Sequence, residues 1–128
     1  MLYAVLCYNS EDSVFSWSKQ EEEAVMGRLI AAQEKMARAG RLGPVARLMP
    51  TTAPTTLRKD REPAVVIDGP FAETKEQLLG FYVVDCDSLE EALDFARDLG
   101  NANPSGAYEI RPLLQFRPGD LKPGTLPA

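Results

Sequence analysis

The sequence contains no histidine, and this absence excludes several whole classes of chemistry. Histidine is the side chain that ordinarily changes charge near neutral pH, so the chain lacks the usual general base and the usual partner of a nucleophilic Ser or Cys. Histidine-ligated zinc and haem are excluded as well. We therefore expect no metal and no cofactor, and we expect any acid–base chemistry to come from Asp, Glu, Lys, Tyr or Cys.

Cysteine is scarce, and long hydrophobic runs are missing. Cys7 and Cys86 stand far apart among apolar neighbours, with neither a Cys-x-x-Cys motif nor a disulfide framework, which favours a reducing cytoplasm. No apolar run approaches the roughly 20 residues needed to cross a bilayer. The first residues show no basic segment typical of a signal peptide. We expect a cytoplasmic protein with no membrane partner.

Positive charge is also in short supply. The chain has 14 Lys and Arg against 19 Asp and Glu, a formal net charge of −5, which argues against a nucleic-acid partner because phosphate binding needs a basic surface. Its 128 residues and 45% hydrophobic content are typical of one globular domain. We expect that domain to cover residues 1–116, followed by a Pro- and Gly-rich tail over 117–128.

Two segments have the pattern of amphipathic helices. In each, a serine precedes a glutamate by three residues, which is the capping-box spacing, and apolar residues then recur at intervals of three and four. A glycine follows each stripe as a natural end point. The boxes are Ser18 with Glu21 and Ser88 with Glu91, and the predicted helices cover about 19–39 and 89–99, ending at Gly40 and Gly100.

The remaining apolar segments predict strands, and their order predicts the fold. Residues 2–8 and 78–84 are apolar at both parities, whereas the segment around Tyr108 and Ile110 alternates with charged residues. Residues 45–48 form a further short strand, and two arms around Asp60-Arg61-Glu62 form a hairpin. The arms of the hairpin are residues 55–59 and 64–67. Residues 9–17, which follow the first strand, are expected to be a polar loop.

This order is that of a ferredoxin-like α+β fold, a split βαβ sandwich with an inserted β-hairpin. In that fold both helices cover one face of the sheet and the other face is bare. Because the two central strands are apolar on both faces, a monomer would expose an apolar surface of several hundred Å². A second copy of the same face is the simplest cover, so we expect a homodimer.

The nine residues from Asp68 to Glu76, followed by Leu79-Gly80-Phe81-Tyr82, closely resemble the signature of the YCII-related family in its DGPF-domain branch. The opening Met1-Leu2-Tyr3 and the closing Glu109-Ile110-Arg111-Pro112 agree with it. The resemblance implies a dimeric α/β-barrel form of the ferredoxin-like fold. Activity in other branches is inferred from a His–Asp pair, of which only the aspartate maps onto this chain, at Asp68. Some relatives are linked to extracytoplasmic-function sigma factors, which implies a regulatory partner.

Asp68 is the candidate catalytic residue, and two roles are open for it. Its carboxylate could act as a base or anchor a ligand in a cleft near the dimer interface, or it could simply accept backbone N–H groups in an Asp-Gly-Pro turn. Arginine can bind an anion with two hydrogen bonds, although a surface ion pair is its more common role. The candidate ligand-binding residues are Arg47, Arg58, Lys75, Tyr82 and Arg111.

Three functions follow from these observations. The first is a small-molecule-binding protein or enzyme with its site near the DGPF turn and the dimer cleft. The second is a non-catalytic regulatory or interaction module associated with a sigma-factor system. The third is a cofactor-independent oxygenase or isomerase of the dimeric α/β-barrel class, which rests on analogy of fold alone.

Overall fold

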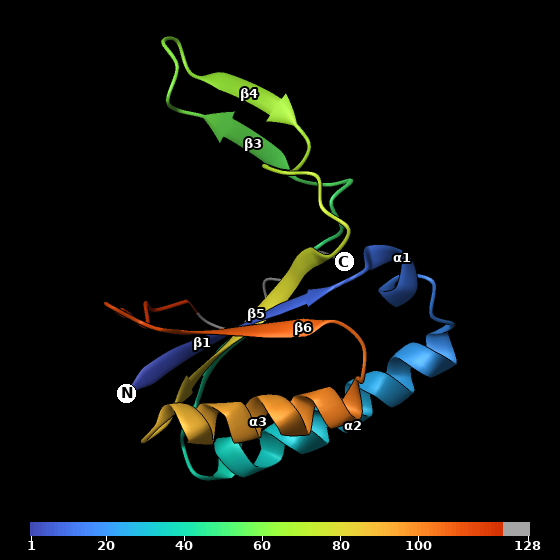
Figure 1. The fold of residues 1–128 in the computed structure, drawn as a ribbon, viewed down its shortest axis with the longest axis vertical. Coiled ribbons are helices and arrows are strands. Elements are labelled where there is room, and N and C mark those ends of the chain that lie inside the picture. The colour runs from blue at the N-terminus through green and yellow to red at the C-terminus, as the bar shows by residue number, and fades with distance from the viewer. Residues whose placement is uncertain (122–128) are drawn as a thin grey trace.

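The computed structural model describes residues 1–121 and shows a four-stranded antiparallel sheet with two long helices on one face (Figure 1). The strand order β2-β5-β1-β6 places the first strand and the strand before the last helix in the centre, which confirms the predicted ferredoxin-like α+β fold. The predicted tail falls partly on residues 122–128, which lie outside the described residues. In chain order the elements are β1 (Leu2–Asn9), α1 (Glu11–Val14), α2 (Lys19–Arg38), β2 (Leu42–Arg47), β3 (Thr55–Arg58), β4 (Val65–Asp68), β5 (Gln77–Asp85), α3 (Leu89–Ala102) and β6 (Ala107–Pro112).

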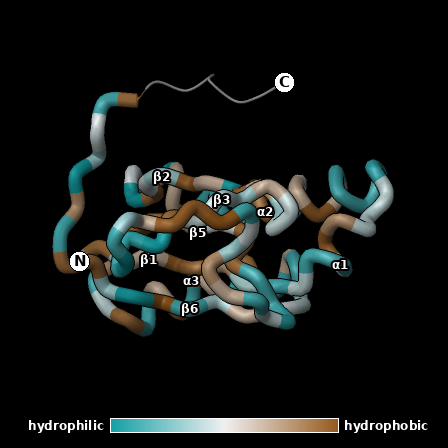
Figure 2. Tube along the Cα trace, turned by 90° about the horizontal axis from the view of Figure 1, so that it is seen from above, coloured by the Kyte–Doolittle hydropathy of each residue, from teal (hydrophilic) through white to brown (hydrophobic). Residues whose placement is uncertain are grey.

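The core lies between the sheet and the two helices. Val5 pairs with Tyr82 across β1 and β5, and Tyr3 pairs with Val84, so these four side chains share the helix-facing side of the sheet. They are buried together with residues of α2 and α3. Figure 2 shows hydrophobic stretches of the chain running along the central strands. Side chains alternate across a strand, so the neighbouring positions must face the other way.

Both predicted capping boxes open their helices. The Ser18 hydroxyl accepts a hydrogen bond from the backbone N–H of Glu21, and the Ser88 hydroxyl accepts one from Glu91. Helix α2 ends just before Gly40, which takes a positive φ of 69°, a conformation that favours glycine.

Helix α3 continues beyond its predicted end at Gly100. It runs to Ala102, which is buried against the core, and the backbone N–H of Asn103 still bonds to the carbonyl of Leu99. A glycine within a helix weakens it by only about 1 kcal/mol, and burial of the last turn outweighs that cost.

The expected loop after β1 contains the short helix α1, which the sequence did not predict. Its last residue, Val14, is buried, and the N–H of Val14 bonds to the carbonyl of Ser10. The Glu11 carboxylate also accepts a hydrogen bond from the backbone of Thr51. A helix of one turn is too short to show a periodic pattern of apolar residues in the sequence, so α1 could not be predicted from such a pattern.

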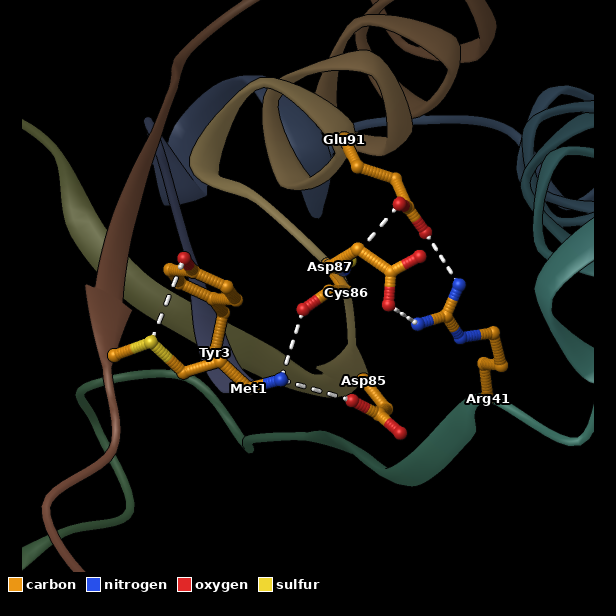
Figure 3. Close-up of polar contacts among 7 residues, drawn as sticks. All are labelled: Met1, Tyr3, Arg41, Asp85, Cys86, Asp87 and Glu91. Atoms are coloured by element: carbon orange, nitrogen blue, oxygen red, sulfur yellow. Dashed lines mark hydrogen bonds and ion pairs between the residues drawn. The ribbon is translucent and has the colours of Figure 1, made fainter.

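The start of α3 is held by a polar cluster at the end of β5 (Figure 3). The Arg41 guanidinium donates to Glu91 Oε1 and to Asp87 Oδ1, each at 2.7 Å. The hydrogen bond from Arg41 holds the pKa of the Asp87 carboxyl below its ordinary value. The N-terminal ammonium group binds Asp85 and the carbonyl of Cys86 in the same region. These contacts tie β1, β2 and β5 to the helix and are structural in character.

The predicted hairpin is confirmed as β3 and β4, which pair only with each other. It projects away from the sheet and helices (Figure 1). Several of its apolar side chains are exposed, among them Leu57, Val66 and Ile67. Among residues 1–121, no helix is long and apolar enough to span a membrane.

Candidate functional site

A cavity of about 170 Å³ lies between α2 and the helix-facing side of the sheet. It is lined mainly by apolar groups, with a few polar side chains among them. Six of the lining side chains come from β1, β2, β5, β6, α2 and the segment before α2. They are Cys7, Trp17, Gln33, Arg47, Tyr82 and Tyr108.

The floor of the cavity comes from three adjacent strands. Cys7 pairs with Tyr108 of β6 on one side and with Gly80 of β5 on the other, so all three face the helices together with Tyr82. Gly80 contributes no side chain to the floor, because the backbone of the neighbouring strand fills the space that a Cβ atom would take. A Cβ atom there would collide with the carbonyl oxygen of Ala46 in the neighbouring strand.

One face of α2 forms the roof. Met26, Leu29, Ile30 and Gln33 recur at intervals of three, one and three, which places them on one side of a helix. The Gln33 side-chain amide donates a hydrogen bond to the Tyr82 hydroxyl at 3.3 Å. This bond orients the tyrosine hydroxyl in a region whose other lining groups are mostly apolar.

Arg47, at the end of β2, also lines the cavity. Its Nη1 atom forms an ion pair with Glu22 of α2 at 2.8 Å. Its guanidinium carbon lies 5.6 Å from the centre of the Phe15 ring, a cation–π distance. The arginine thus links β2 to α2 and to the segment that precedes α2.

The ordinary pKa values of the titratable groups of the floor lie above neutral pH, and burial raises them further. It raises the pKa of the Cys7 thiol to about 12, and it raises the pKa values of the Tyr82 and Tyr108 hydroxyls above their ordinary range. At neutral pH these three groups are protonated hydrogen-bond donors. Among the described residues that line the cavity there is no carboxylate.

The structure brings two of the predicted site residues together and separates the others. Arg47 and Tyr82 both line the cavity. Arg58 belongs to the hairpin, where it pairs with Asp60 and lies over a phenylalanine ring. Arg111 lies on β6 and pairs with a glutamate two residues earlier. Lys75 is exposed in the connection from β4 to β5.

Asp68 lies at the end of β4, exposed and outside the lining of the cavity. Its backbone pairs with Thr55. The turn that follows is held by other groups: the N–H of Gly69 bonds to the carbonyl of Pro54, and the Thr56 hydroxyl donates to the carbonyl of Gly69. Among the described residues, no hydrogen bond or ion pair reaches the Asp68 carboxylate.

Sequence reasoning missed Cys7, Gln33, Gly80 and Tyr108 as site residues. In the sequence, Cys7 lies among apolar neighbours, and Tyr108 lies in a strand that alternates with charged residues. The glycine within the otherwise apolar strand β5 was the available signal, because an isolated glycine in a strand often marks a close approach of backbone or ligand. In the described part of the chain, no group of three or more Cys, Asp or Glu side chains is arranged to hold a metal ion.

Comparisons with known proteins agree with this architecture. The family model of the YCII-related domain matches residues 1–117. An uncharacterised protein of Rhizobium meliloti (strain 1021) is 66% identical over 122 residues, which cover 94% of this chain and 98% of that protein.

A solved structure is similar in fold at much lower sequence identity. It is 5-chloro-2-hydroxyhydroquinone dehydrochlorinase (TftG) from Burkholderia phenoliruptrix AC1100 in complex with 2,5-dihydroxybenzoquinone. The TM-score is 0.54 at 11% identity, with 91% of this chain and 96% of that chain covered. The finer assignment to the DGPF-domain branch stays a prediction. The match over residues 1–117, together with the close relative, shows that the chain belongs to the YCII-related domain family.

Proposed function

We propose that this protein binds a small, planar organic molecule in the cavity between α2 and the sheet. The observation that carries the proposal is the cavity itself, with a volume of about 170 Å³ and mainly apolar walls. An engineered apolar cavity of about 150 Å³ is large enough to bind benzene. A single aromatic ring is therefore the size of ligand that fits.

The polar groups of the floor indicate what such a ring carries. Cys7, Tyr82 and Tyr108 are neutral at physiological pH, since the ordinary pKa values of thiols and phenols lie above 7 and burial raises them further. A hydroxyl or carbonyl oxygen on the ring would accept hydrogen bonds from the Tyr82 and Tyr108 hydroxyls, whereas the Cys7 thiol already donates to the carbonyl of Val5. The dehydrochlorinase of similar fold was solved with a single-ring quinone, which supports the same size and class of ligand.

Phenol is the probe that we would use to test this function. Trp17 is the single tryptophan of the chain and lines the cavity, so binding should change its fluorescence. Val45 also lines the cavity but is 46% exposed, and Val45→Phe should place a larger group in the cavity without disrupting the core. We expect Val45→Phe to weaken phenol binding at least several-fold, as measured by saturation-transfer NMR and tryptophan fluorescence.

The matched control is Val66→Phe, the same change on the projecting hairpin, where the valine is 65% exposed. This variant should bind phenol as the wild type does. Absence of phenol binding to the wild type, or an equal loss in both variants, would contradict the proposed site.

We also propose that the protein works as a homodimer. The sheet face opposite the helices carries Leu6, Leu79 and Phe81, which are only partly buried within one chain. Their side chains alternate with those of the core, as the pairing of Leu6 with Phe81 requires. A second copy of this face would cover them.

A further inference from the structure

We infer that the ligand of this cavity carries an anionic group, of the carboxylate type, which Arg47 binds while the ring lies among the apolar walls. This inference rests on the proposed function and names the chemical class of its ligand: a single-ring aromatic carboxylate. Three observations on the described residues support it, concerning charge, free hydrogen-bond donors and the position of the guanidinium.

The first observation is the charge of the lining. Arg47 is the single Lys, Arg, Asp or Glu among the residues that line the cavity. The other titratable side chains are Cys7 and tyrosines, which are uncharged at neutral pH. Glu22 pairs with Arg47 but does not line the cavity, so within the lining a cationic ligand would meet a like charge and an anionic ligand a complementary one.

The second observation is the set of donors that Arg47 leaves available. Its contacts with Glu22 and with the Met26 sulfur both use Nη1. In the described part of the chain, no hydrogen bond joins Nε or Nη2 to another residue. These two N–H groups form one edge of the guanidinium, which matches the two oxygens of a carboxylate. The ion pair with Glu22 and binding of a ligand carboxylate are therefore compatible.

The third observation is that the guanidinium is already positioned. The ion pair with Glu22 and the contact with the Phe15 ring hold the side chain from two directions. An arginine held in this way loses less side-chain entropy on binding than a mobile surface arginine would. Arg47 thus reaches the cavity with its guanidinium held by two contacts and with 39% of its side chain exposed.

The experiment compares benzoate with benzamide, which has nearly the same shape but no charge. NMR titrations of the full chain measure the affinity of each compound for the wild type and for Arg47→Gln. We expect benzoate to bind about tenfold more tightly than benzamide, which is the order of a hydrogen-bonded charge pair. Arg47→Gln should remove this preference by weakening benzoate binding about tenfold while leaving benzamide binding unchanged.

Arg97→Gln is the matched control, because Arg97 also forms ion pairs but lies exposed on α3 outside the cavity. It should change neither affinity. Arg47→Lys keeps the charge but lacks the planar pair of donors, so its affinity for benzoate should be several-fold lower than that of the wild type. If Arg47→Gln does not fold, Arg47→Lys takes its place in the experiment.

The outcomes separate the two proposals. Equal binding of benzoate and benzamide to the wild type, or a benzoate affinity that is insensitive to Arg47→Gln and Arg47→Lys, would overturn the anionic ligand and leave the ring-binding cavity in place. If benzoate, benzamide and phenol all fail to bind the wild type, the proposed function fails with it.

Discussion

Asp68 begins both the family signature and the turn that follows β4. The surroundings of its carboxylate bear on whether it is a site residue or a turn residue. The side chain is exposed, and it makes no hydrogen bond to another described residue. The turn beside it is closed instead by the Thr56 hydroxyl, which donates to the carbonyl of Gly69 at 2.8 Å. Within one chain, the residue that stabilises this turn is therefore Thr56 rather than Asp68.

A pair of substitutions tests this assignment. Asp68→Ala should change the free energy of unfolding by less than about 0.5 kcal/mol, as is usual for an exposed side chain without partners. Thr56→Val removes the hydrogen bond to Gly69 and should destabilise the protein by about 1 kcal/mol. Urea denaturation of both variants measures the difference. A loss of more than about 2 kcal/mol in Asp68→Ala would show that its carboxylate has a buried partner in the assembled protein.

At the scale of elements, the contact between β2 and β5 shapes one wall of the cavity. Gly80 pairs with Arg47 at this contact, and a Cβ atom at position 80 would collide with the carbonyl oxygen of Ala46. The strands can approach this closely only because the residue is glycine. The same glycine lines the cavity, so strand packing and the candidate site meet at one position.

Two Gly→Ala substitutions should therefore have opposite effects on stability. Gly80→Ala forces β2 and β5 apart and should destabilise the protein by about 1–3 kcal/mol. Gly27 lies within α2, and a Cβ atom there would have no neighbour within 4 Å, so Gly27→Ala should stabilise the protein by up to about 1 kcal/mol. Thermal unfolding followed by circular dichroism compares the two melting temperatures. Equal shifts of the same sign would contradict the close contact at Gly80.

For the whole molecule, the question is what covers the apolar surfaces that one chain leaves open. The projecting hairpin exposes Leu57 and Val66, and the segment that leads to it exposes Leu48 and Met49. The sheet face opposite the helices carries partly buried apolar side chains as well. An isolated two-stranded hairpin is only marginally stable in water. Both features agree with the proposed homodimer, in which a second copy packs against them.

Light scattering tests the assembly directly. At micromolar concentration the protein should have a mass of about 28 kDa, twice the 14.1 kDa of one chain. Leu6→Lys places a charge on the open sheet face and should shift the mass toward that of one chain, because burial of an unpaired charge is costly. A wild type that remains at 14.1 kDa over the whole concentration range would rule out the dimer.

The sequence by itself determined the elements and the topology, because these depend on local patterns. The serines at positions 18 and 88 marked both helix starts, the apolar runs marked the central strands, and the hairpin followed from its turn residues. Each signal comes from residues close together in the chain, where hydrogen-bond and periodicity rules apply directly. The end of α3 and the helix α1 were not predicted, because Ala102 and Val14 are placed by burial against distant residues.

Only the tertiary structure decided which side chains meet. Arg47 and Tyr82 were candidates among several, and the fold places these two at one cavity with Cys7, Gln33 and Tyr108. These residues come from five different elements, so no spacing in the sequence relates them. Packing between α2 and the sheet also sets the burial that raises the pKa values of Cys7 and the tyrosines. How readily a thiol or phenol ionises depends on its surroundings in space, which the chain specifies only once it has folded.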